Sequence, residues 1–304
     1  MIYSGRSEEL VGPLIDQFRQ ASGIEVQVRY GSTSELAATL LEEGTRSPAD
    51  VFFAQDPAGL GAVEPLFAPI PDDKFSAVEP RFRSPGGRWV GVSGRARTVV
   101  YNTESLAVSD LPDDLRGFTE PRWKGRIGWA PTNGSFQAMV TAMRALWGEE
   151  ETGNWLKGIQ HNEPKIYPKN TPIVAAVGSG EVEVGFVNHY YLMRFLKEHG
   201  ESFPARNYHP RGGGPGAAIL VSGAGVMASS QNKELAWRFL EFLLSPDAQQ
   251  YFADRTFEYP VVTGVKTHSL LAPLARIDAP ELNMADMADL DGTLRLLREA
   301  GVLP

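Results

Sequence analysis

The sequence contains no cysteine, so the chain has no disulfide bond, no thiolate ligand for a metal and no thiol nucleophile. Any metal ion must therefore be bound by oxygen or nitrogen atoms. No stretch reaches the roughly 18 uninterrupted apolar residues of a membrane-spanning helix, and no basic and apolar leader opens the chain. Because Met1 runs directly into an apparent strand, we expect that a leader has been removed.

Basic residues are outnumbered: 29 Lys and Arg face 37 Asp and Glu, a formal net charge of −8. A nucleic-acid partner is not expected, because such proteins carry basic stripes. The sequence also lacks G-x-S-x-G, H-E-x-x-H, a P-loop and a properly placed G-x-G-x-x-G, and its five histidines show no metal-ligand spacing. We therefore predict that the protein is not an enzyme and that its partners are small solutes or other proteins.

Helical and strand patterns alternate along the chain, which is typical of α/β folds. A length of 304 residues favours two lobes. The first part predicts strands and helices in turn at 2–4, 7–23, 24–30, 32–44 and 49–54. The centre repeats the alternation at 125–130, 136–148, 171–180 and 182–188, and later helices are expected at 232–244, 245–255 and 291–300.

Two apolar stretches, 89–102 and 217–227, are too long for one buried strand and too rich in glycine for a helix. We interpret them as strands that cross between the lobes. The predicted fold is α/β, with two doubly wound lobes, two crossing strands and a ligand cleft between the lobes, where strand ends meet. The predicted N-terminal lobe is 1–97 with 223–272, the C-terminal lobe is 98–222 with 273–304, and the hinge lies near 98–102 and 218–227.

Two tyrosines, Tyr190 and Tyr191, follow the predicted strand 182–188 and precede an apparent helix start at "LMRFLKEHG". One interpretation is packing, with one ring in the core and the other on the surface. The other is metal ligation, because adjacent residues at a bend can direct both side chains to one point. A phenol has a pKa near 10 and ionises at neutral pH only beside a strong cation. Hard ferric ion is such a cation.

An anion site is predicted at "APTNGSF", where Asn133, Gly134 and Ser135 lie before a helix whose first N–H groups are unpaired. Simple capping of the helix is the alternative. Three arginines fall near predicted strand ends and crossings, and their guanidinium groups suit a small anion: Arg6, Arg95 and Arg97.

Polar residues also end the apolar strand at 49–54, where Gln55 and Asp56 precede a proline. They either ligate or cap the turn. Asp56 is the one carboxylate that we can assign to a cleft hydrolase, and no second catalytic group accompanies it, so we rank that function last.

An ordered series of stretches spans nearly the whole chain: "IYSGRSEELV", "GIEVQVRYG", "SPADVFFAQD", "VGVSGRARTVVYN", "WKGRIGWAPTNGSF", "NWLKGI", "GFVNHYYL" and "SGAGVM". In this order they resemble the periplasmic ferric ion-binding proteins, the solute receptors of bacterial iron ABC transporters. The resemblance implies a type II periplasmic binding protein fold. It also implies that Tyr190 and Tyr191 supply phenolates to Fe³⁺, and that Asn133, Gly134, Ser135 and Arg97, with Arg6 or Arg95, hold a synergistic anion.

The chain departs from that family at three places. A histidine and a glutamate used by some members are replaced by Ser7 and Gln55, and a third tyrosine used by others is replaced by Phe136. Tyr30 is a candidate extra oxygen ligand, with packing as its alternative role. Bidentate carbonate or bicarbonate, rather than phosphate, is our expected complement to the tyrosine pair.

The resemblance further implies an exported monomer, periplasmic or lipid-anchored at the cell surface, that delivers ferric ion to the membrane subunits of an ABC permease. The alternative binding function is a receptor for an organic anion such as a phosphonate, with the tyrosines lining its pocket and no metal. Added Fe³⁺ separates the two, because a tyrosinate–iron complex absorbs visible light.

Overall fold

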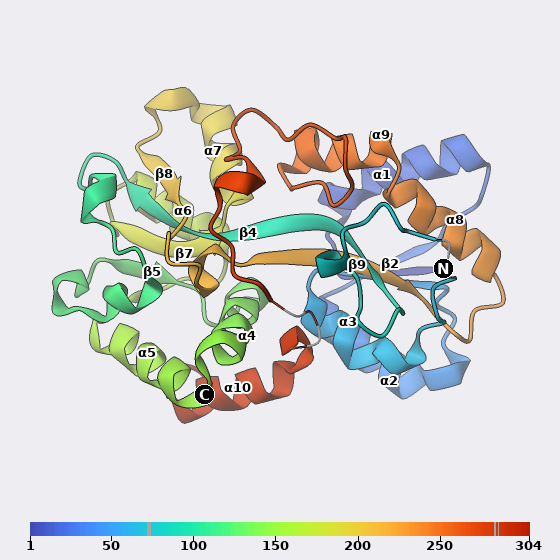
Figure 1. Ribbon diagram of the computed structural model, residues 1–304, viewed down its shortest axis with the longest axis horizontal. Helices are drawn as coiled ribbons and strands as arrows, with labels where there is room; N and C mark the ends of the chain where they lie inside the picture. The colour runs from blue at the N-terminus through green and yellow to red at the C-terminus, as the bar shows by residue number, and fades with distance from the viewer. Residues whose placement is uncertain (72–73, 283, 285) are drawn as a thin grey trace. The chain divides into compact units, whose positions relative to one another are not determined.

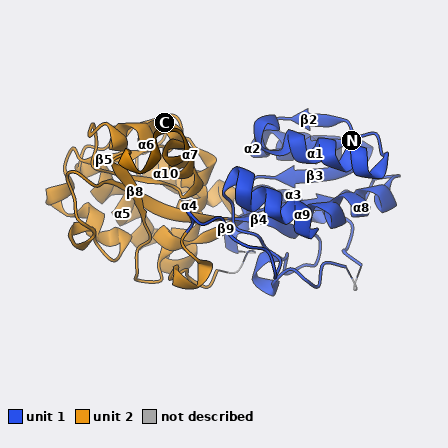
Figure 2. Cartoon of the chain, turned by 90° about the horizontal axis from the view of Figure 1, so that it is seen from above, with its two compact units in different colours: residues 1–94, 221–271, 283–288 blue, residues 95–220, 272–282, 289–304 orange. Residues whose placement is uncertain are grey.

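The computed structural model describes residues 1–71, 74–282, 284 and 286–304. The chain forms two compact units, each assembled from three separate segments (Figure 2). Unit 1 comprises 1–94, 221–271 and 283–288, and unit 2 comprises 95–220, 272–282 and 289–304. Two strands, β4 (Val90–Asn102) and β9 (Ile219–Val226), carry the chain from one unit into the other.

The sheet of unit 1 is built around β1 (Ile2–Ser4). Strands β2 (Val28–Tyr30) and β3 (Val51–Ala54) lie parallel to β1 on either side, and β9 pairs antiparallel with β3. Every residue of β1, β3 and β9 is buried. The near-continuous apolar sequence of β3 is the pattern expected for a strand that is covered on both faces.

Several helices of unit 1 begin at a side-chain cap. The Ser32 hydroxyl accepts from the backbone N–H of Glu35, and the Asp56 carboxylate accepts from that of Gly59, each satisfying an otherwise unpaired donor. Figure 1 shows these helices with their labels. Their bounds are α1 (Glu8–Ser22), α2 (Thr33–Glu43), α3 (Pro57–Val63), α8 (Lys233–Leu243) and α9 (Pro246–Tyr251).

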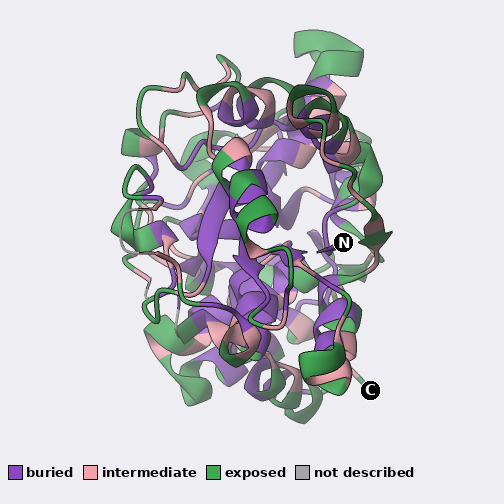
Figure 3. Ribbon diagram, turned by 90° about the vertical axis from the view of Figure 1, so that its right-hand side faces the viewer, coloured by how far each residue is buried: buried purple, intermediate pink, exposed green. Residues whose placement is uncertain are grey.

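The sheet of unit 2 mixes parallel and antiparallel pairs. Strand β7 (Val184–Asn188) pairs antiparallel with β4 and parallel with β5 (Ile127–Trp129), whose other neighbour is β6 (Lys165–Ile166). Strand β8 (Ala205–Tyr208) pairs antiparallel with β4. All 13 residues of β4 are buried, and Figure 3 shows the buried strands among helices with exposed outer faces.

The helices of unit 2 pack on an aromatic core that includes Trp123, Trp129, Trp155 and Phe186. The last helix, α10 (Leu290–Glu299), is held to α4 (Gly134–Trp147) by Arg144, whose guanidinium donates to the Asp289 carboxylate at 2.7 Å. None of the described helices has the length and apolar character needed to cross a membrane. The helix bounds are α4 (Gly134–Trp147), α5 (Glu149–His161), α6 (Asn170–Gly178), α7 (Tyr190–His199) and α10 (Leu290–Glu299).

The predicted α/β fold is confirmed, and both long apolar stretches are strands, β4 and β9. The strand predicted at 24–30 is wrong at its start, because β2 has only three residues. Its partner β1 begins at Ile2, which pairs with Val28, so none of the described strands continues beside residues 24–26. The carbonyl of Val26 instead accepts from the Arg19 guanidinium.

Candidate metal centre

The tyrosine pair lies at a direct transition from strand to helix. Strand β7 ends at Asn188, His189 already has helical dihedral angles (φ −55°, ψ −38°), and Tyr190 is the first residue of α7. The prediction that both tyrosines precede the helix is therefore wrong by two residues. The physical reason is that His189 leaves the strand conformation immediately, without a loop.

The two phenol rings lie side by side. The ring centroids of Tyr190 and Tyr191 are 4.4 Å apart with an angle of 29° between the ring planes, and Tyr190 is 3% exposed. Burial raises the pKa of the Tyr191 phenol above its usual value, and the charge of the neighbouring Tyr190 and the hydrogen bond between the two phenols add to the rise. Without a cation, Tyr191 is therefore a neutral phenol near pH 7.

Close to the phenols lies Arg97 of β4, a fully buried guanidinium whose hydrogen bonding is incomplete. Its Nη1 donates to Asn188 Oδ1 at 2.8 Å and to the Ser135 hydroxyl at 3.4 Å, while Nε and Nη2 have no acceptor in the described part of the chain. Burial lowers the pKa of Arg97 to about 9, although Tyr190 and Tyr191 act in the opposite direction. A buried cation with two unmatched donors is a position where an anion is favoured.

A network of side-chain hydrogen bonds surrounds the start of α4. Asn133 caps the helix: its Oδ1 accepts from the backbone N–H (3.1 Å) and hydroxyl (2.6 Å) of Ser135 and from Asn170 Nδ2 (3.1 Å). Asn170 Nδ2 also donates to the Ser135 hydroxyl at 2.9 Å. The space beside Gly134 is open, because an added Cβ there would meet no atom within 4 Å. Capping and anion binding are thus compatible at this helix N-terminus.

Asn170 and Asn188 are bonded to the candidate site residues, and the sequence analysis missed them. Asn188 ends β7 and Asn170 begins α6, so both occupy the strand-end and helix-start positions at which α/β sheets bind ligands. That position was the available signal, but an asparagine at a helix start is also an ordinary capping residue.

The remaining candidates in unit 2 differ in their surroundings. Arg95 is buried and lies close enough to Arg97 and Tyr191 to lower the pKa of both. Phe136 is 1% exposed and packs edge to face on Trp129, with ring centroids 5.4 Å apart, so it belongs to the core.

The candidates in unit 1 for which contacts are given are bonded to other residues of unit 1. The Arg6 guanidinium forms a buried ion pair with Glu258, with Nη1 3.1 Å from Oε2. Asp56 caps α3, and the backbone N–H of Gln55 donates to the Thr33 hydroxyl at 3.0 Å. Burial raises the pKa of Tyr30, the last residue of β2.

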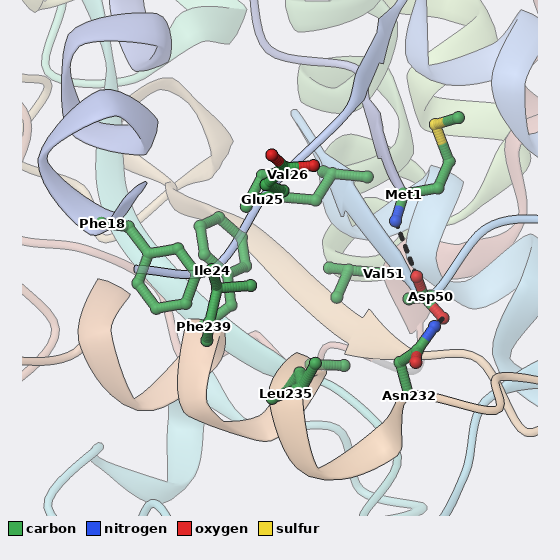
Figure 4. A pocket seen from close by; sticks show the side chains of 12 residues that line it. Met1, Phe18, Ile24, Glu25, Val26, Asp50, Val51, Asn232, Leu235 and Phe239 are labelled. Carbon is green, nitrogen blue, oxygen red and sulfur yellow. Dashed lines mark hydrogen bonds and ion pairs between the residues drawn. The ribbon is translucent and has the colours of Figure 1, made fainter. Parts of the chain in front are cut away.

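Two further observations concern other places in the chain where a metal ion or ligand would bind. Among the described residues, His, Asp and Glu side chains form no group of three that could hold a metal ion, so a hard cation would depend on other oxygen atoms. A pocket of about 190 Å³ lies in unit 1 between α1, α8 and the starts of β1 and β3 (Figure 4). None of the predicted site residues lines it.

Comparison with known proteins finds relatives that are named as iron-binding proteins. A family model described as bacterial extracellular solute-binding protein matches residues 13–276. The chain is 35% identical over 306 residues to the major ferric iron-binding protein of Neisseria meningitidis serogroup A, covering 99% of this chain and 92% of the relative. It is 35% identical over 307 residues to the Fe(3+)-binding periplasmic protein of Serratia marcescens, covering 100% and 90%. The structure of iron-bound HitA from Pseudomonas aeruginosa matches with a TM-score of 0.93 at 34% identity, covering 99% of this chain and 98% of that one.

Proposed function

The chain belongs to the bacterial extracellular solute-binding proteins, and within them to the periplasmic ferric ion-binding proteins, and on that premise we propose that it binds ferric ion through Tyr190 and Tyr191 with a small anion. Its structural neighbours have the predicted type II periplasmic binding protein fold. Its relatives are solute-binding proteins of iron transport rather than enzymes, as the sequence predicted.

The observation that carries the proposal is the pair of stacked phenols beside a buried, incompletely bonded guanidinium. Two phenolates are hard, anionic oxygen ligands that suit Fe³⁺. The ferric charge lowers the cost of ionising Tyr190 and Tyr191, as any strong cation does for an adjacent acid. The proposed site residues lie within unit 2, and the chain has no cysteine thiolate that would favour softer metals.

The anion is proposed to bind at the start of α4. Arg97 offers its Nε and Nη2 donors, and the open helix start at Gly134 offers the backbone. Because Arg6 is paired with Glu258, Arg97 and Arg95 balance the anion's charge in this proposal. Carbonate or bicarbonate fits the planar fork of one arginine and is our preferred anion, with phosphate as the alternative.

Two phenolate oxygens leave most coordination positions around the ferric ion to the anion and to water. Gln55 and Phe136 are not strong ferric ligands. We propose that the protein is an exported monomer that delivers this ferric complex to the membrane subunits of an ABC permease.

The proposal is tested by titrating metal-stripped protein with ferric salt, with and without bicarbonate. We expect a visible charge-transfer band at one iron per chain, with tighter binding when bicarbonate is present. A protein that stays colourless with both additions contradicts the proposal. If that colourless protein binds a phosphonate, the organic-anion receptor is the correct function.

Substituting Arg97 by Met should separate the anion's contribution from the metal's. A hydrogen bond to a charged group contributes about 1.5–3 kcal/mol, so the bicarbonate enhancement of iron affinity should fall roughly 10- to 100-fold. The metal-free variant should be at least as stable to heat as the parent, because the substitution removes a buried charge with unmatched donors. Arg122→Met, at an exposed arginine paired with Glu120, is the matched control and should change neither quantity.

A further inference from the structure

The strand pairing that leads to the tyrosines ends in an unusual way. Strands β4 and β7 pair antiparallel up to Arg97 and Asn188, so Ala96 and His189 would form the next pair. The backbone N–H of His189 does donate to the Ala96 carbonyl at 3.0 Å. The reciprocal bond differs, because the Ala96 N–H donates to the His189 imidazole, at 3.1 Å from Nδ1.

The imidazole of His189 thus takes the place of the residue's own carbonyl. Since His189 already has helical dihedral angles, its carbonyl turns away from β4 and accepts from Asn207 Nδ2 at 2.8 Å. The Ala96 N–H is buried, and a buried donor without an acceptor is unfavourable. The Nδ1 acceptor lets the chain pass from strand to helix within one residue without leaving that donor unpaired. Nδ1 also lies 3.3 Å from the Ala96 carbonyl oxygen, and it accepts from the Ala96 N–H in the tautomer that carries its proton on Nε2.

We propose that His189 is a positioning residue that fixes the buried arginines and the tyrosine pair relative to one another. Its acceptor holds the peptide of Ala96, which lies between Arg95 and Arg97. Its ring meets the Tyr190 ring edge to face, with centroids 5.7 Å apart at 87°. The orientation of the anion-binding guanidinium and the first turn of α7 are therefore set by one side chain. This inference rests on the proposed function, because it assigns His189 a role in ferric binding.

The chemistry predicts which residues can replace His189. The acceptor must be bonded to Cγ, where both the histidine Nδ1 and the asparagine Oδ1 are found. Asparagine should therefore preserve the bond to Ala96, whereas leucine keeps an apolar side chain of moderate size without any acceptor. Matched variants His189→Asn and His189→Leu isolate the acceptor from side-chain volume.

The first measurement is hydrogen exchange of the Ala96 amide in metal-free protein, which is independent of iron. We expect His189→Leu to exchange at least about tenfold faster than the parent at this amide, and His189→Asn to remain protected. Unchanged protection in His189→Leu would overturn the assigned bond.

The second measurement is the ferric charge-transfer band and the ferric affinity of the same three proteins. We expect a shifted band and about tenfold weaker binding in His189→Leu, with both restored in His189→Asn. If the parent protein shows no band, the proposed function itself fails. If the parent shows the band and His189→Leu has the same band and affinity, the positioning role fails alone. Should His189→Leu not fold, a folded His189→Asn that loses the parent's band overturns the inference.

Discussion

Replacing both Tyr190 and Tyr191 by phenylalanine should abolish the visible band and lower ferric affinity by roughly a thousandfold or more, about 4 kcal/mol. Phenylalanine keeps the stacked rings, whose centroids are 4.4 Å apart, and removes only the oxygen atoms. The loss is large because the described His, Asp and Glu residues offer no alternative cluster of ligands. Absorption spectra and a competitive titration against a ferric chelator measure both effects.

Proton release gives an independent check of the same prediction. Burial raises the pKa of Tyr191, so below that pKa the hydroxyl keeps its proton until the metal displaces it. Two phenolate ligands should release two protons per ferric ion bound. Ferric affinity should therefore weaken on acidification, by up to about a hundredfold per pH unit, in the parent but not in the double variant.

The matched control is Tyr208→Phe, also in unit 2. The Tyr208 hydroxyl donates to the Asp113 carboxylate at 2.9 Å and has no part in the proposed site. Its band and affinity should equal those of the parent. A double variant at 190 and 191 that colours like the parent would mean that the metal is bound elsewhere or that the tyrosines only line the site.

The second large effect is expected from Glu258→Gln, which should lower the free energy of unfolding by about 3–5 kcal/mol. Glu258 is 0% exposed and Arg6 is 1% exposed, and the carboxylate is also bonded to the Ser93 hydroxyl, which lies 2.6 Å from that of Ser222. Glutamine leaves the buried guanidinium without its counter-charge. The melting temperature of metal-free protein should fall by roughly 10 °C.

Two further variants identify the cause of that destabilisation. Arg6→Met combined with Glu258→Gln should recover most of the lost stability, because no unpaired buried charge remains. Asp16→Asn breaks the exposed pair with Arg19, whose side chains are 59% and 40% exposed, and should cost less than about 1 kcal/mol. Equal effects of Glu258→Gln and Asp16→Asn would show that the buried pair contributes no more than a surface pair.

Segments with helical spacing of apolar residues alternate along the chain with segments that have the pattern of a strand. This alternation predicted the α/β class, because local patterns determine helices and buried strands. The apolar stretches at 89–102 and 217–227 predicted β4 and β9 for the same reason. The arginines were harder to interpret. The partner of Arg6, Glu258, lies 252 positions away, and no local pattern links two residues at that separation.

The candidate site was predictable only in part. The adjacent tyrosines and the "TNGS" turn are contiguous signals, and the structure brings Asn133 and Ser135 together in one network. Asn170 and Asn188 join that site through tertiary packing, with Asn188 contacting Arg97 from the neighbouring strand. Their role depends on which strands pair, and the sequence pattern does not contain that information.

The interleaved segments of the two units also constrain when the protein can fold. Unit 1 needs residues up to 288 and unit 2 needs α10, which Asp289 and Arg144 fasten to α4. During synthesis from the N-terminus, unit 1 stays incomplete until residue 288 has left the ribosome, and unit 2 until α10 has done so. Each unit can therefore complete its folding only after nearly the whole polypeptide has been made.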